Sequence, residues 1–341
     1  LAERAAQMLR DATVTAAEPA LLTDLAVWYH LAWLGETVRR GDPRVRPLLR
    51  RAGDFSTADR RQLLECIADV LSGLVPRYRR LAGNGQVELS ISPWGHPVMP
   101  LLFDFAAAHE ADPGLVLPAA PCYPGGGDRA RWHLALALQV FHRAFGLRPR
   151  GCWPAEGAIS DATLAMLDGF GFDWTASADG VLRRSAGGIP AAAAHCGWRR
   201  GGQRLVCFFR HDELSERVGF EYSHQDGDAA AADLVLELER LAANGGLQGR
   251  NVISLVMDGL NAWESFPDGG YRFQRALYRR LAAHPRLRLS TFARCLQQGV
   301  EVRPLETLVA GSWIDGRLDT WIGNPERNAL WQWLCDAKAV F

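Results

Sequence analysis

Short apolar runs that end in polar turns recur along the chain and predict strands. Residues 252–257 read V-I-S-L-V-M, and their β-branched members favour a short buried strand that stops at Asp258. Residues 87–92 read V-E-L-S-I-S, and this alternation predicts a strand that leads into Trp94 and His96. Further short strands are predicted at 172–176, 205–209 and 287–289.

Longer stretches with apolar residues at helical spacing predict helices between these strands. Residues 1–40 form one such stretch, and a second begins at Ser56, where Pro76 is expected to kink or divide it. Residues 178–202 lack periodicity and are interpreted as an irregular excursion. Further helices are predicted at 129–145, 160–169, 228–244, 272–283, 291–298 and 325–336. Strands alternating with helices indicate an α/β fold with a mostly parallel sheet or barrel.

Two carboxylates follow predicted strands or lie in short connections, where reactive groups of α/β folds are usually placed. Asp258 comes directly after the predicted strand at 252–257. Glu156 lies among Trp153, Pro154 and Gly157 in a connection before a helix. A strand fixes such a side chain while the following loop shapes a pocket. The pattern therefore favours a chemistry that uses two carboxylates.

Composition narrows the classes of partner. The chain has 341 residues with 38 Lys plus Arg and 38 Asp plus Glu, so no global field attracts nucleic acid or an anionic membrane. Twelve Trp are present, and Trp94, Trp153, Trp263 and Trp313 fall in loops bounded by Gly or Pro. Aromatic faces in loops suit sugar rings, although core packing is the alternative for any one of them.

The cysteines and the apolar runs indicate a soluble protein of the cytoplasm. Seven Cys are scattered without the C-x-x-C or Cys-His spacing of a zinc site, which is typical of free thiols in a reducing compartment. No run approaches the ~20 apolar residues that span a bilayer, and no secretory signal pattern is visible. The sequence does not indicate an oligomeric state.

Five segments in order resemble the family 57 glycoside hydrolases, which act on α-glucans as amylases, branching enzymes and glucanotransferases. They include G-C-W-P-A-E-G, ending at Gly157, and M-D-G-L-N-A-W-E, ending at Glu264. The segments lie at 86–102, 151–157, 208–220, 257–264 and 312–323. The resemblance implies an incomplete (β/α)7 barrel with a helical N-terminal segment over residues 1–303. Residues 304–341 would begin a C-terminal helical region that closes over the cleft.

The resemblance also implies roles for residues. Glu156 would be the nucleophile and Asp258 the general acid/base of a retaining mechanism, in which two carboxyl groups stand about 5 Å apart and no metal or organic cofactor is needed. His96 would lie next to the cleaved bond, or else be a structural turn residue. The remaining candidates for substrate binding are Trp94, Trp153, Arg210, His211, Asp212, Trp263, Glu264, Trp313 and Trp321. The polar cluster at 210–212 would either orient a catalytic carboxylate or form a buried salt bridge, and Trp321 would equally suit the core.

Two departures from the family pattern leave alternatives open. The family usually opens with a strand carrying His-x-His-Gln-Pro, which this sequence does not contain. We expect either that this strand precedes Leu1 in the full-length protein or that the chain lacks one wall of the site. Leu260 stands where Asp-Gly-Glu-Asn is usual, so a charge beside Asp258 is lost. The sequence therefore predicts an α-glucan hydrolase or transglycosidase, with a weakly active or inactive carbohydrate-binding relative as the alternative.

A metal-dependent deacetylase on a similar barrel is a third candidate. Such an enzyme needs a His-x-x-x-His pair beside an Asp, and no two of the nine His have that spacing. The sequence thus disfavours it. Whether the chain hydrolyses, branches or disproportionates depends on how well an acceptor sugar competes with water, which the sequence does not reveal.

Overall fold

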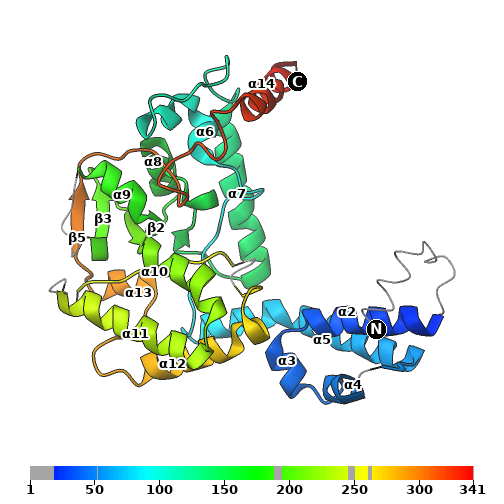
Figure 1. Ribbon diagram of the computed structural model, residues 1–341. Coiled ribbons are helices and arrows are strands. Elements are labelled where there is room, and N and C mark those ends of the chain that lie inside the picture. Colours follow the sequence, from blue (N-terminus) through cyan, green and yellow to red (C-terminus); the bar gives the residue numbers. More distant parts are fainter. Residues whose placement is uncertain (1–18, 52, 188–193, 245–249, 260–262, 341) are drawn as a thin grey trace.

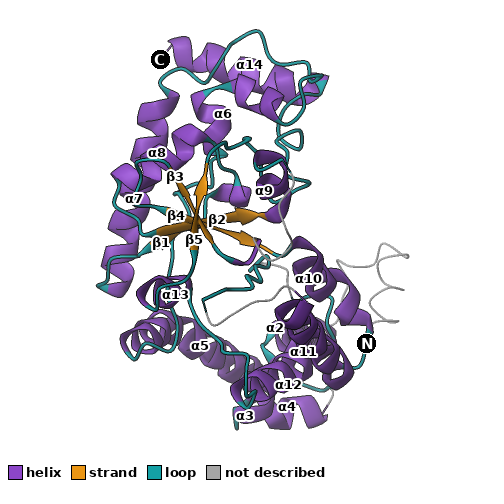
Figure 2. Ribbon diagram, turned by 90° about the vertical axis from the view of Figure 1, so that its left-hand side faces the viewer, coloured by secondary structure: helices purple, strands orange, loops and turns teal. Residues whose placement is uncertain are grey.

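A five-stranded open sheet forms the centre of the protein (Figure 2). The computed structural model describes residues 19–51, 53–187, 194–244, 250–259 and 263–340. In spatial order the strands are β1 (Gly151–Cys152), β2 (Trp174–Ala178), β4 (Val206–Arg210), β3 (Gly197–Arg200) and β5 (Val302–Leu305). Neighbours are parallel except β3 with β4, which are antiparallel. The predicted α/β fold with a mostly parallel sheet is confirmed, and the sheet does not close.

Two predicted strands reduce to single bridges at the margins of this sheet. Ile91 pairs in parallel with Cys152, and Ser254 pairs in parallel with Arg210. The prediction of a strand over 252–257 is wrong, because the pairing does not extend beyond Ser254: the amide of Val256 donates to Ser215 Oγ, and its carbonyl accepts from Arg210. The predicted strand at 287–289 is also wrong, since that stretch has no strand.

The two faces of the sheet alternate with period two, as the strand pattern requires. Trp174, Ala176, Val206 and Phe208 form a small core with α13 (Phe292–Gln297). Cys152, Cys207 and Phe209 point to the other face and join the main core. Main-core residues also come from α7 (Gly126–Phe145) and α8 (Asp161–Gly169). The strand ends that carry the polar residues are thus fixed by packing on both sides.

Most predicted helices are confirmed within a few residues. The other main helices are α6 (Met99–Phe103), α9 (Asp179–Ser185), α10 (Asp212–Glu216), α11 (Gly227–Asn244), α12 (Tyr271–Ala282) and α14 (Pro325–Val340). The excursion predicted at 178–202 instead contains α9 and β3. These two elements are too short for a helical or strand periodicity to be visible in the sequence. Contacts with neighbouring elements stabilise them. The division predicted at residue 303 falls within β5.

A helical arm projects from the body (Figure 1). It consists of α2 (Pro19–Trp33), α3 (Glu36–Gly41), α4 (Val45–Arg51) and α5 (Thr57–Gly83), with a small core of its own. A capping box starts α5, where Ser56 and Asp59 bind each other's backbone amides. Pro76, expected to kink or divide this helix, lies inside α5 without dividing it, and a kink stays a prediction.

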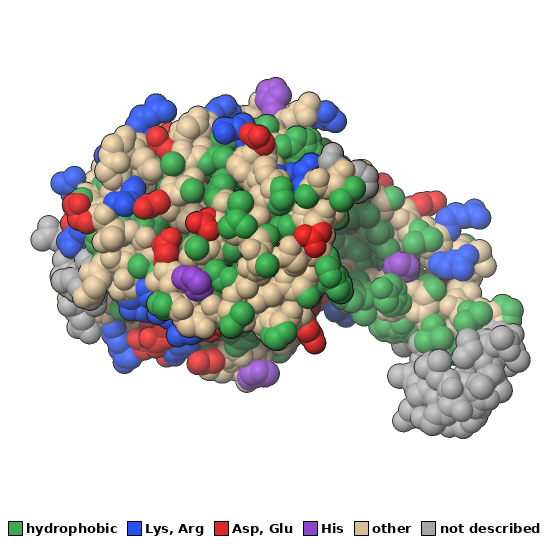
Figure 3. All heavy atoms as spheres, turned by 90° about the horizontal axis from the view of Figure 1, so that it is seen from above, with side chains coloured by type: hydrophobic (Ala, Val, Ile, Leu, Met, Phe, Trp, Pro, Cys, Tyr) green, Lys and Arg blue, Asp and Glu red, His purple; other side chains and the backbone are tan. Residues whose placement is uncertain are grey.

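The surface is mixed in character. Figure 3 shows charged side chains of both signs spread over the body, with hydrophobic side chains gathered where the arm meets it. Several apolar residues of the second half of α5 are exposed, among them Leu71 and Tyr78. Among the described helices, none combines the length and the apolar character needed to cross a membrane.

A substitution at Gly151 tests how closely β1 packs against Trp174. A Cβ at this position would lie 1.9 Å from the Trp174 ring. We expect Gly151→Ala to lower the free energy of unfolding by about 1–3 kcal/mol, because overpacking forces the buried indole to move. Urea denaturation measures the change. Gly73→Ala is the control: it lies in α5 with no atom within 4 Å of its Cβ and should raise stability by roughly 0.5–1 kcal/mol. Equal stability of Gly151→Ala and the native protein would contradict this packing.

Candidate active site

The backbone around Glu156 is held in an unusual conformation directly after β1. Glu156 has φ 56° and ψ 24°, in the left-handed region that non-glycine residues seldom adopt. The next residue, Gly157, accepts a 2.6 Å hydrogen bond from the buried hydroxyl of Ser177 in β2. The amide of Trp313 donates to the Glu156 carbonyl at 3.0 Å. Hydrogen bonds from Ser177 and Trp313 therefore hold this strained turn and fix the direction of the Glu156 side chain.

The Glu156 carboxylate has two nitrogen-bearing neighbours. Trp313 Nε1 donates to Glu156 Oε2 at 2.8 Å, and His96 Nε2 lies 3.5 Å from Oε1. The side chain of Glu156 is 28% exposed, so a ligand can reach it. Trp153 packs edge-on against Trp313 with ring centroids 5.4 Å apart. The structure thus brings together four predicted site residues, and the nearby Trp94 is exposed to solvent.

Arg210 connects this cluster to the segment that ends in Asp258. Its guanidinium is buried and lies 5.0 Å from the centre of the Trp313 ring. It binds Asp212 at 2.7 Å and donates at 3.4 Å to the backbone carbonyls of Trp313 and Val256. Asp258, half-buried, follows two residues after Val256. The two candidate catalytic residues are therefore linked through Trp313 and Arg210, while Leu260 lies outside the described residues.

Three other predicted residues have their contacts elsewhere. Trp263 packs against Phe266 and Phe273 in the core between α11 and α12. Glu264 is exposed. Trp321 packs partly buried against the main core, and its carbonyl accepts from Trp331. Their assignment to substrate binding stays a prediction.

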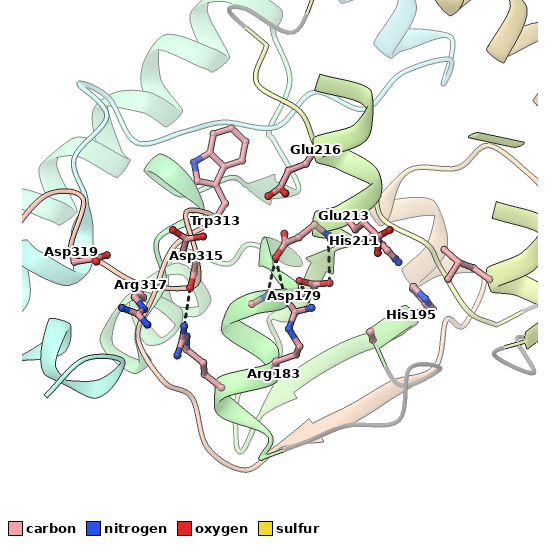
Figure 4. Close-up of a pocket in the computed structure, with 15 residues that line it drawn as sticks. Asp179, Arg183, His195, His211, Glu213, Glu216, Trp313, Asp315, Arg317 and Asp319 are labelled. Atoms are coloured by element: carbon pink, nitrogen blue, oxygen red, sulfur yellow. Dashed lines mark hydrogen bonds and ion pairs between the residues drawn. The ribbon is translucent and has the colours of Figure 1, made fainter. Parts of the chain in front are cut away.

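A large cavity opens at the carboxyl ends of β2 and β4 (Figure 4). Its volume is about 1160 Å³, above the roughly 300–1,000 Å³ of common small-molecule sites. His195 and His211 stack along one wall with nearly parallel rings, 5.7 Å apart. Burial lowers the pKa of His195 to about 4 and also lowers that of His211, so both rings are neutral near pH 7. Most of the other residues that line the cavity are charged; they include Asp179, Arg183, Asp212, Glu213, Glu216, Asp315, Arg317 and Asp319, together with Trp313.

Asp179 and Asp212 form a carboxyl pair at this cavity. Each follows a parallel strand, at the same edge of the sheet. Arg183 lies 2.7 Å from Asp179 and 3.8 Å from Asp212. Burial, together with the hydrogen bond and charge of Asp179, raises the pKa of Asp212 to about 7, against the opposing effect of Arg210. The pair can therefore hold a proton near neutral pH.

Sequence reasoning missed Asp179, Arg183 and His195. A weak signal existed for Asp179, because it comes three residues after the predicted strand at 172–176. No local pattern marks His195, which reaches the cavity only because β3 pairs with β4. In the described part of the chain no group of three side chains is arranged to hold a metal ion.

The carboxyl pair generates a prediction on pH and stability. The unfolded chain releases the Asp212 proton near pH 3.8, whereas the folded protein keeps it until about pH 7. The free energy of unfolding should therefore fall as pH rises through this window, by at most about 1.4 kcal/mol per pH unit from this group. Asp212→Asn should flatten the decline, as measured by urea denaturation between pH 4 and 8. If the free energy of unfolding of Asp212→Asn falls with pH as steeply as that of the native protein, a group other than Asp212 holds this proton.

Comparison with known proteins identifies the family. The model described as Glycosyl hydrolase family 57 matches residues 18–309. No curated protein matches the chain. A GH57-type branching enzyme from Pyrococcus horikoshii has a similar structure, with a TM-score of 0.62 and 16% identity over 91% of this chain and 61% of its own. The GH57 branching enzyme of Thermococcus kodakaraensis gives a TM-score of 0.60 and 15% identity over 90% of this chain and 63% of its own.

The α-amylase AmyC of Thermotoga maritima gives a TM-score of 0.59 and 12% identity, covering 86% of this chain and 63% of its own. The chain thus spans less than two thirds of the length of each of these three enzymes. At such low identities the likeness shows the shared fold alone. Because the family model matches most of the chain, the chain belongs to glycosyl hydrolase family 57.

Proposed function

We propose that this chain carries the catalytic site of a retaining α-glucan hydrolase or transglycosidase, with Glu156 as nucleophile and Asp258 as general acid/base. The observation that carries the proposal is the clamped, left-handed turn that presents Glu156 between Trp313 and His96. The substrate class follows from the family and from relatives named as branching enzymes and an α-amylase.

In the first step, a carboxylate oxygen of Glu156 attacks the anomeric carbon and forms a glycosyl ester. The bond to the glycosidic oxygen breaks, and Asp258, protonated, gives its proton to that oxygen. In the second step, Asp258 takes a proton from water or from an acceptor hydroxyl. The oxygen so activated attacks the anomeric carbon, and the ester to Glu156 is released as a carboxylate.

The contacts of Glu156 suit the first step. Trp313 Nε1 binds Oε2, which leaves Oε1, on the side of His96, as the oxygen that attacks. The indole hydrogen bond fixes the carboxylate without neutralising it, because indole donates a proton but does not release it. His96 is half-exposed and can bind a sugar hydroxyl. The site therefore orients an ionised nucleophile toward an open side.

The position of Asp258 suits the acid/base role. The adjoining backbone is held through Val256, whose carbonyl accepts from the buried Arg210. Since Arg210 also contacts Trp313, a shift of either carboxylate segment would disturb the other. This coupling supports a constant separation between the two groups, which a retaining mechanism needs.

Replacement of Glu156 tests the nucleophile. Glu156→Gln should abolish labelling by a mechanism-based 2-deoxy-2-fluoroglycosyl fluoride and lower turnover of maltooligosaccharides by at least about 10⁴-fold, because an amide is a poor nucleophile. Intact-mass spectrometry detects the label. Glu65→Gln, on the exposed face of α5, is the matched control and should label fully. Full labelling of Glu156→Gln would refute the assignment.

Replacement of Asp258 tests the acid/base. Asp258→Asn should lower turnover of starch by about 10²–10⁴-fold, the usual contribution of general acid–base catalysis. The first step with a glycosyl fluoride should persist, because fluoride leaves without protonation. A fluoride electrode measures the burst. Equal losses on starch and on the burst would contradict a role in protonating the leaving group.

A further inference from the structure

The cavity at the ends of β2 and β4 does not include Glu156 but shares Trp313 with it. Trp313 binds Glu156 through its indole nitrogen and also lines the cavity. Glu156, His96 and Trp153 do not line it. Figure 4 shows Trp313 at one margin and Asp179 with Arg183 at the centre. Trp313 is therefore a wall shared by the nucleophile and the cavity.

The cavity adjoins the segment that leads to Asp258. The amide of His211, a cavity residue, donates to the carbonyl of Ser254 at 2.8 Å. Asp212, its neighbour in the lining, binds Arg210, which in turn binds the carbonyl of Val256. The cavity thus borders the segment that carries the proposed acid/base.

This placement has a chemical meaning in a double displacement. The sugar that leaves in the first step is protonated by the acid/base, so it departs on that side. An acceptor that replaces water must enter from the same side, because the second step reverses the first. We propose that this cavity binds the acceptor glucan, with Asp179, Asp212 and Arg183 as the groups that bind its hydroxyls. The inference rests on the proposed function and adds a site to it.

The charges of the cavity suit a neutral polyol. Six carboxylates line it, against three arginines, so an anionic ligand is disfavoured. Carboxylates accept from sugar hydroxyls, the arginines donate to them, and the neutral histidines can donate or accept. The carboxylates are Asp179, Asp212, Glu213, Glu216, Asp315 and Asp319, and the arginines are Arg183, Arg184 and Arg317.

Asp179 is the best-placed of these groups. The residue is 9% exposed, lines the cavity, and one of its oxygens, Oδ1, is buried without a hydrogen-bond donor among the described residues, although Arg183 forms an ion pair with it. Arg183 itself is 60% exposed, so its truncation opens no core. A purely structural ion pair would be expected to leave sugar binding unchanged when either partner is replaced.

Direct binding tests the cavity without any turnover. Binding of maltotetraose to Glu156→Gln is measured by calorimetry at pH 7, and then with Asp179→Asn or Arg183→Ala added. We expect each addition to weaken binding by about tenfold, the loss of one charge-assisted hydrogen bond. Asp268→Asn is the matched control, because Asp268 also pairs with arginine but belongs to another surface, and it should change nothing. Equal affinities in all forms, or no binding of maltotetraose, would overturn the proposal.

The acceptor role is tested by how the glycosyl group divides between transfer to an acceptor and hydrolysis, in a chain that keeps Glu156. With a maltosyl fluoride donor and maltotetraose as acceptor, Asp179→Asn should lower the ratio of transfer products to hydrolysis products by about tenfold. An unchanged ratio would overturn the acceptor assignment. Absence of fluoride release from the native chain would instead refute the proposed function, and the calorimetric result would still decide whether the cavity binds sugar.

Discussion

The buried guanidinium of Arg210 is the interaction on which the site depends. A charge held out of water is costly unless it is paired, so Asp212, the backbone carbonyls of Val256 and Trp313, and the Trp313 ring must all stay near it. These partners come from three segments far apart in sequence. Arg210 therefore fixes the segment that leads to Asp258 and the segment around Trp313 at the end of β4.

The same logic explains how Glu156 is presented. A left-handed glutamate is strained, and it persists only because its surroundings determine it. Ser177 holds the following residue from β2, and Trp313 holds both the backbone and the carboxylate. Because Trp313 is positioned in turn by Arg210, Glu156 and the carboxyl pair at the cavity share one scaffold. The chemistry is thus distributed over strand ends, while the packing on both sheet faces keeps those ends in register.

The carboxyl pair gives the cavity a character that neither residue has alone. Asp212 keeps its proton to about pH 7 because burial and Asp179 disfavour a second negative charge. The neutral histidines add no compensating charge, since burial lowers the pKa of both. Arg183 then balances the remaining charge from the exposed side. A pocket of this kind presents many hydrogen-bonding groups, with more carboxyl groups than arginines, and this suits the neutral sugar proposed as its ligand.

The sequence by itself determined most of the helices, β4, the placement of Glu156 in a connection before a helix, and the family. Helical periodicity and caps such as Ser56 are local, so they can be recognised without tertiary contacts. The structure alone decided the two-residue strand β1 and the strand β3 inside an Ala/Gly-rich stretch. It likewise decided that residues 252–257 pair only at Ser254 and that Trp263 packs, partly buried, against a core. It also decided that Asp179 meets Asp212. Such short strands and long-range pairs are stabilised by neighbours distant in the chain, and no window of sequence contains both partners.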